Sequence, residues 1–176
     1  MIGVYDYTVL ATYLSLAFGV SGILAAMNGS PYSALLCLMV SGLLDAFDGR
    51  IARTKKNRTE QEKRFGIQID SLNDVVCFGV LPGVIGASLG GGEWWLRASV
   101  LFYILAALIR LAYFNVTEEE RQSATNEHRH YYLGVPVTAA SFVMPLFWAL
   151  PLRLGSAPTV IYAVGLTLLA FLFIAP

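Results

Sequence analysis

Charge is scarce in this chain. Charged residues make up only 14% of its 176 positions, whereas a soluble domain usually carries about 25%. Acidic and basic residues are equal in number, twelve of each, so the formal net charge is zero. No overall basic excess is available for binding nucleic acid. With so little polar surface to offer water, the chain is expected to use lipid as its solvent.

Cysteine and secretory features are also sparse. Cys37 and Cys77 lie in apolar segments without a CxxC pair or a histidine at metal-ligand spacing, so they are interpreted as buried, reduced thiols. The first apolar run is preceded by Asp6 and by no basic residue. That pattern is not typical of a cleaved signal peptide, and the first segment is expected to be a retained membrane span.

Long apolar segments are what the chain has in abundance. Hydrophobic residues make up 56% of the sequence, and a helical span needs about 20 of them in succession. We expect an all-α integral membrane protein with a single membrane domain over residues 1–176. Its six predicted spans are 7–27, 32–53, 65–89, 94–116, 135–150 and 157–176.

The Lys and Arg residues between these spans predict the orientation. Seven of them lie in the connections after the second and fourth spans, and two lie on the opposite side, at Arg97 and Arg153. Basic residues favour the cytoplasmic side of a membrane. Both termini and both polar connections are therefore expected in the cytoplasm of a multi-pass cell-membrane protein.

A few charged residues lie inside the predicted spans. Asp45 and Asp48 belong to the second span, Asp70 and Asp74 to the third, and Arg110 to the fourth. A charge at bilayer depth costs a few kcal/mol or more, so an intramembrane ionisable group indicates function. The alternatives are structural salt bridges or the ion site of a cation transporter.

Helical spacing places these groups on one face of each span. Asp45 and Asp48 are three residues apart, while Gly66, Asp70 and Asp74 follow one another at steps of four. Residues three or four apart share a helix face. Because the second and third spans are joined by a short connection, they are expected to be antiparallel neighbours with their carboxylates facing each other.

Four carboxylates in a medium of low dielectric repel one another unless cations neutralise them. Arg53 and Arg110 supply only two positive charges. Two hard divalent cations that prefer oxygen ligands, Mg²⁺, Mn²⁺ or Ca²⁺, would neutralise the remaining negative charge. Gly49 and Gly66 carry no side chain and would let a phosphate or nucleotide approach the backbone.

This pattern resembles the signature of the CDP-alcohol phosphatidyltransferase family. Its residues here are Asp45-x-x-Asp48-Gly49-x-x-Ala52-Arg53 and Gly66-x-x-x-Asp70-x-x-x-Asp74. The gap between Arg53 and Gly66 is longer than is usual in the family, but the extra residues fall between the helices.

The resemblance implies six helices around a polar cavity open to the cytoplasm, usually in a homodimer. It implies that Asp74 is the catalytic base and that all four aspartates hold two divalent cations. The residues that it implies for the CDP and diphosphate site are Asp45, Gly49, Arg53, Gly66 and Asp70.

Three further stretches resemble the phosphatidylserine synthases of that family: 65–82, 110–116 and 134–136. This resemblance implies transfer of a phosphatidyl group from CDP-diacylglycerol, or an ether-lipid equivalent, to L-serine. Arg110 is a candidate for binding the serine carboxylate, because a guanidinium can donate two parallel hydrogen bonds to a carboxylate. The alternative is that Arg110 pairs with an aspartate. Asn115 is a second candidate. Glycerol 3-phosphate or inositol phosphate is the alternative acceptor.

Overall fold

The described part of the chain is entirely helical, as the composition predicts. The computed structural model describes residues 3–55, 57, 59–124, 134–154 and 158–175, leaving aside the side chains at 52–53, 121–124 and 151–154. The helices are α1 Leu10–Met27, α2 Pro31–Thr54, α3 Glu60–Asp74, the π-helix η1 Val75–Val80, α4 Leu81–Ser88, α5 Trp94–Ala124, the 3₁₀-helix η2 Val137–Ala139, α6 Ala140–Leu154 and α7 Pro158–Ile174.

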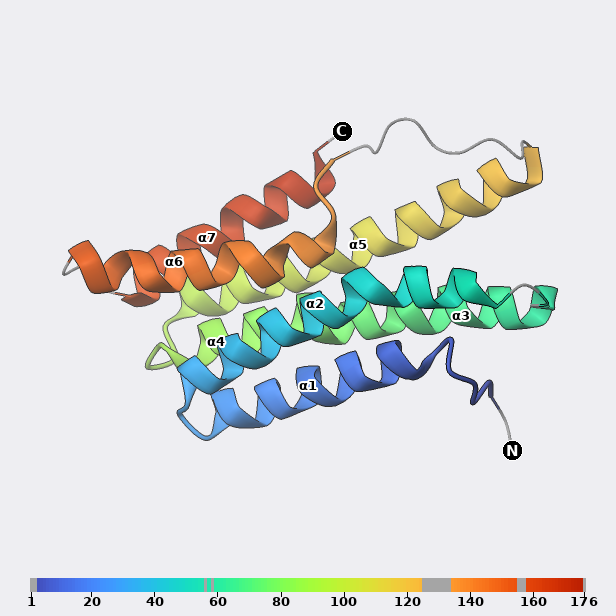
Figure 1. Cartoon of the computed structure of the whole chain (residues 1–176). Coiled ribbons are helices and arrows are strands. Elements are labelled where there is room, and N and C mark those ends of the chain that lie inside the picture. The colour runs from blue at the N-terminus through green and yellow to red at the C-terminus, as the bar shows by residue number, and fades with distance from the viewer. Residues whose placement is uncertain (1–2, 56, 58, 125–133, 155–157, 176) are drawn as a thin grey trace.

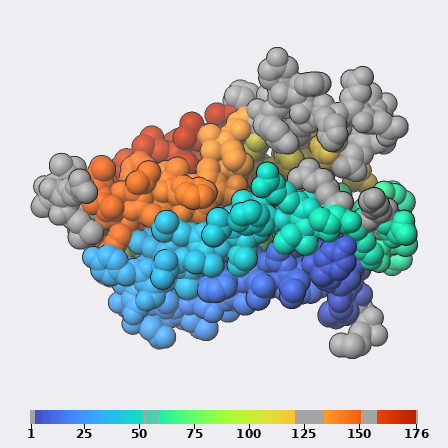
Figure 2. Space-filling model, in the orientation of Figure 1, coloured from blue at the N-terminus to red at the C-terminus, as the bar shows by residue number. Residues whose placement is uncertain are grey.

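The helices form an elongated bundle (Figure 1). Helix α1 packs along α2, α5 packs against α7, and α6 contacts both α2 and α7. Helices α1, α2 and α6 make up much of one face of the molecule (Figure 2). The core between the helices includes Phe78, Tyr103, Met144 and Tyr162, all fully buried.

Three of the described helical segments are long and apolar enough to cross a bilayer: Leu10–Met27, Glu60–Ser88 and Trp94–Glu120. The segments Val137–Leu150 and Pro158–Ile174 are apolar but shorter. Large apolar side chains are exposed along much of the bundle, which suits a surface solvated by lipid. The membrane character is supported, while the number of six spans stays a prediction.

The helices extend further into the polar connections than the hydropathy pattern predicts. Helix α3 begins at Glu60 instead of Phe65, because Thr59 and Glu62 form a capping box. The Thr59 hydroxyl accepts from the Glu62 N–H at 3.2 Å, and the Thr59 N–H donates to Glu62 Oε2 at 2.9 Å. This box satisfies backbone donors of the first turn and stabilises a helix start in a polar sequence.

One continuous helical segment carries α3, η1 and α4. Pro82 explains the change of helical type, because proline has no N–H to donate to the carbonyl four residues before it. That carbonyl belongs to Phe78, and it accepts instead from the Tyr103 hydroxyl at 2.6 Å. The π-helical turn directly follows Asp74, and π-turns are frequent at functional sites.

Candidate active site

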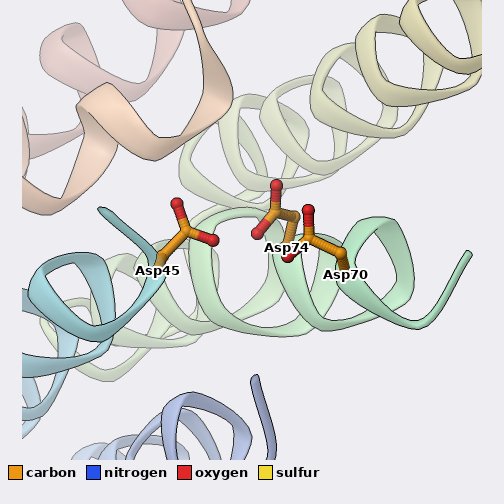
Figure 3. Close-up of side chains that lie close together, drawn as sticks. All are labelled: Asp45, Asp70 and Asp74. Atoms are coloured by element: carbon orange, nitrogen blue, oxygen red, sulfur yellow. The ribbon is translucent and has the colours of Figure 1, made fainter. Parts of the chain in front are cut away.

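Three of the four predicted aspartates lie together between α2 and α3. Asp45, Asp70 and Asp74 each present a carboxylate oxygen within 4.8 Å of the others. Figure 3 shows Asp45 on α2 facing Asp70 and Asp74, which lie one helical turn apart on α3. The antiparallel arrangement and the four-residue spacing therefore produce the acidic cluster that the sequence predicts.

The chemistry of this cluster fits divalent cations. Asp70 Oδ1 and Asp74 Oδ1 are both buried and accept no hydrogen bond from the part of the chain that the structure describes. A buried carboxylate oxygen without a donor is costly, and a cation would satisfy it. The residues thus fit the predicted Mg²⁺ or Mn²⁺ chemistry, which requires hard oxygen ligands.

Asp48 lies beside this cluster and not within the group of three. It is only 9% exposed and interacts electrostatically with Asp45 and Asp70. Its Oδ2 accepts a hydrogen bond from the hydroxyl of Thr12 on α1, at 3.2 Å. A role for Asp48 as a cation ligand stays a prediction.

The other predicted donor-site residues lie near the cluster along α2 and α3. Gly49 follows Asp48 directly and is exposed, and Gly66 lies one turn before Asp70 and is partly exposed. Arg53 belongs to α2, but its side chain lies outside the described residues. The predicted contacts of Gly49, Arg53 and Gly66 with a CDP group therefore stay predictions.

Arg110 and Asp74 line the same cavity, of about 340 Å³. Its other lining residues are Leu111, Phe114, Gly134, Pro136, Val137 and Thr138. Gly134 has φ of +71°, and a Cβ there would lie 3.5 Å from Arg110 Cζ and 3.1 Å from the carbonyl oxygen of Ala175. Glycine at this position thus allows the left-handed backbone and avoids a tight contact with the Ala175 carbonyl oxygen, while the guanidinium lies at ordinary contact distance.

Asn115 lies in a different cavity, of about 550 Å³, together with polar side chains of α3 that include Arg64 and Gln68. Its Oδ1 accepts from the Ser71 hydroxyl at 2.9 Å, so it joins α5 to α3 beside Asp70. Among the described lining residues, the cavity of Asp74 and Arg110 does not include Asn115. The two candidates for serine binding are thus divided between two cavities.

Behind the cluster, α1 contributes a buried polar network that the sequence analysis missed. Ser15 Oγ pairs with Ser41 Oγ at 2.7 Å and accepts from Asn73 Nδ2 at 3.2 Å. Asn73 Oδ1 in turn accepts from the thiol of Cys77 at 3.2 Å. Cys77 is fully buried, as predicted, whereas Cys37 is only partly buried, so its predicted burial is wrong. The missed residues are small and uncharged, and only the polar atoms at helical spacing on α1 could have indicated them.

An ion-pair network joins the segment before α1 to the connection between α2 and α3. Lys55 Nζ donates to Asp6 Oδ2 at 2.7 Å and to Glu62 Oε1 at 2.9 Å. Hydrogen bonds from Lys55 and then Thr8 lower the pKa of Asp6 to about 2. The same contacts, to Asp6 first, raise the pKa of Lys55. Both charges are therefore retained over the ordinary pH range.

Comparison with known proteins defines the class to which this helical bundle and its acidic site belong. The sequence profile of the CDP-alcohol phosphatidyltransferase family matches residues 8–174. The chain therefore belongs to the CDP-alcohol phosphatidyltransferase family, as the aspartate motif predicts.

Several relatives carry more particular names. The CDP-diacylglycerol–serine O-phosphatidyltransferase of Helicobacter pylori strain 26695 is 34% identical over 145 residues, covering 81% of this chain and 56% of the relative. The protein of the same name from Mycobacterium tuberculosis strain H37Rv is 30% identical over 147 residues, 82% of this chain and 49% of the relative. The archaetidylserine synthase of Methanothermobacter thermautotrophicus is 29% identical over 140 residues, which cover 79% of this chain and 56% of the relative. The chain spans about half the length of these relatives.

Proposed function

We propose that this protein transfers the phosphatidyl group of CDP-diacylglycerol, or of an ether-lipid equivalent, to the hydroxyl of L-serine and releases CMP. The observation that carries the proposal is the shared cavity of Asp74 and Arg110 beside the acidic cluster. The names of the relatives support the same substrates, because two of them name serine as the acceptor and the third names a serine-containing lipid as its product.

Asp74 is the proposed general base. A base must lie within hydrogen-bond reach of the proton that it removes, and Asp74 lines the cavity while its Oδ1 accepts no hydrogen bond from the described residues. The serine oxygen forms a bond to the lipid-side phosphorus, the bond from that phosphorus to the CMP oxygen breaks, and the serine proton passes to Asp74. No covalent enzyme intermediate is required.

Arg110 is the proposed partner of the serine carboxylate. A guanidinium donates two parallel hydrogen bonds to a carboxylate and thereby fixes its orientation. With the carboxylate on Arg110, the hydroxyl end of the same small molecule can be directed toward Asp74 on the neighbouring helix. Such orientation by a bidentate contact lowers the entropic cost of the reaction.

For the donor, we propose that Asp45, Asp48, Asp70 and Asp74 hold two divalent cations and that Gly49, Arg53 and Gly66 accommodate the CDP moiety. Bound cations supply charge neutralisation and polarise the diphosphate. The carboxylates also exclude the diphosphate from the site when no cation is present, because like charges repel at short range.

The proposal includes the setting of the enzyme. We propose that the enzyme has six membrane spans, a polar cavity open to the cytoplasm and lipid neighbours, and that it forms a homodimer. Membership of the family and the distribution of basic residues support this arrangement. Protease accessibility of a tag at each terminus in sealed vesicles tests the orientation, because both tags should be accessible only from the cytoplasmic side.

The alternative acceptors, glycerol 3-phosphate and inositol phosphate, carry a phosphate. Such an acceptor calls for a group of basic side chains, and Arg110 is the one basic residue among the described residues that line the cavity. This composition favours a zwitterionic acceptor with a single carboxylate.

The direct experiment measures CMP release by purified protein given CDP-diacylglycerol and Mn²⁺ or Mg²⁺. Serine, glycerol 3-phosphate and inositol phosphate are added one at a time. Release that requires serine supports the proposal, and release that requires another acceptor contradicts the proposed substrate. No release with any acceptor, from folded protein, contradicts the transferase and favours the cation transporter.

A further inference from the structure

Helix α1 carries none of the motif aspartates, yet it contacts one of them directly. Thr12 Oγ1 donates to Asp48 Oδ2 at 3.2 Å. Thr12 is 4% exposed and Asp48 is 9% exposed, so water has little access to either. A hydrogen bond to a charged, buried carboxylate is stronger than one between neutral groups.

The direction of the Thr12 hydroxyl is informative. Threonine within a helix commonly donates to the backbone carbonyl four residues earlier, and Thr167 of α7 does so, to the carbonyl of Ala163 at 2.9 Å. Thr12 donates instead across the helix interface to α2. The hydroxyl is thus directed at the acidic residue next to the cluster.

Ser15 lies one turn further along the same face of α1 and contacts the other acidic helix. It accepts from Asn73, the residue before Asp74, while its pairing with Ser41 holds α1 against α2. These contacts fix α1 relative to both α2 and α3. The position of Thr12 against Asp48 is therefore set by a packed interface.

We propose that Thr12 is a positioning residue for the divalent-cation site, whose hydroxyl holds the Asp48 carboxylate in the orientation that cation binding requires. The inference rests on the proposed function. Asp48 lies beside the three clustered aspartates, and without the Thr12 hydroxyl its Oδ2 loses the donor that α1 supplies. Groups that orient metal ligands in this way typically contribute about 10- to 100-fold to metal affinity.

The test measures Mn²⁺ binding to purified protein, by electron paramagnetic resonance of free Mn²⁺, without substrate. Thr12→Val keeps the shape of the side chain and removes the donor, Thr12→Ser restores the donor, and Thr167→Val is the matched control. We expect Thr12→Val to weaken Mn²⁺ binding about 10-fold or more, with Thr12→Ser and Thr167→Val close to the unsubstituted protein. Unchanged binding by Thr12→Val, or an equal loss in Thr12→Ser or Thr167→Val, overturns the proposal.

A double-mutant cycle with Asp48→Asn separates positioning from general packing. If Thr12 acts through Asp48, adding Thr12→Val to Asp48→Asn weakens Mn²⁺ binding much less than Thr12→Val does alone. Additive losses overturn the proposal. Should Thr12→Val not fold, Thr12→Ala takes its place, with melting in EDTA reporting the fold. If the unsubstituted protein binds Mn²⁺ but releases no CMP, the proposed transferase function is contradicted. The double-mutant cycle then still decides whether Thr12 positions Asp48.

Discussion

Arg110 on α5 and Asp74 at the end of α3 line one cavity, although different helices carry them. The Arg110 guanidinium is a group that could bind the carboxylate of a ligand. The Asp74 carboxylate in the same cavity is a group that could accept a proton. In the proposed function this cavity would bind the serine carboxylate at Arg110 and deprotonate the serine hydroxyl at Asp74. The proposal leads to separate predictions for the two residues.

Asp74→Asn should reduce CMP release with serine by about 100- to 10,000-fold, the usual contribution of a general base. Asparagine has nearly the same shape but cannot accept the proton. The measurement is kcat at saturating Mn²⁺, serine and CDP-diacylglycerol, so that weaker binding does not cause the loss. A kcat equal to that of the unsubstituted protein contradicts the assignment of the base.

Replacing Arg110 by Gln should raise the KM for serine by about 10- to 100-fold, the value of hydrogen bonds to a charged group. The KM for CDP-diacylglycerol should change little. Arg97→Gln is the matched control, because Arg97 belongs to the same helix but is exposed and lines a different cavity. An unchanged serine KM in Arg110→Gln would support the alternative in which Arg110 pairs with an aspartate.

Asp70→Asn should have opposite effects on stability with and without cations. In EDTA the substitution removes like-charge repulsion in the cluster, so the melting temperature should rise by about 2 to 4 °C per kcal/mol of repulsion relieved. Added Mn²⁺ should stabilise the unsubstituted protein, since it binds the folded state, and should stabilise Asp70→Asn much less. Equal stabilisation of both proteins by Mn²⁺ would exclude Asp70 as a ligand.

The contact between Asp6 and Lys55 predicts a pH dependence of stability. The folded-state pKa of Asp6, about 2, lies below its ordinary value of 3.8, so the contribution is present above the ordinary value and is lost as the pH falls toward 2. The raised pKa of Lys55 leaves the contact intact below the ordinary pKa of a lysine.

Asp6→Asn should therefore lower the melting temperature by a constant amount between about pH 5 and pH 9, and the difference should shrink as the pH falls from about 4 toward 2. Thermal unfolding at a series of pH values checks this. A difference that grows on acidification has the wrong sign for this account.

Tyr103→Phe should lower the stability of the bundle by about 1 to 3 kcal/mol, because it removes the hydroxyl that donates to the buried Phe78 carbonyl. Tyr113→Phe, on the same helix and 54% exposed, is the control and should have little effect. Thermal or denaturant unfolding of the two variants gives the comparison. Equal effects would show that the π-helical turn does not depend on the Tyr103 hydroxyl.

The acidic cluster was largely predictable from sequence because helical spacing determines which residues share a face. Asp70 and Asp74, four residues apart, had to lie together, and a short connection brought Asp45 opposite them. The helix boundaries were less predictable. Hydropathy locates apolar residues, whereas α3 begins in a charged stretch because of the capping box at Thr59.

Other features depend on three-dimensional packing and left no clear signal. Thr12 is an ordinary residue of an apolar helix until α1 is packed against α2. The positions of Arg110 and Asn115 in different cavities depend on how α5 lies against α3. These two residues are five positions apart on one helix, and this spacing alone does not indicate which cavity each faces.

The most direct test of the central claim uses L-serine labelled with ¹⁸O in its hydroxyl group, together with CDP-diacylglycerol and Mn²⁺, followed by mass spectrometry of the lipid and of CMP. Attack by the serine hydroxyl predicts a serine-containing phospholipid that retains the ¹⁸O, with no label in CMP. A lipid product without serine, or one whose phosphodiester lacks the label, would contradict the account.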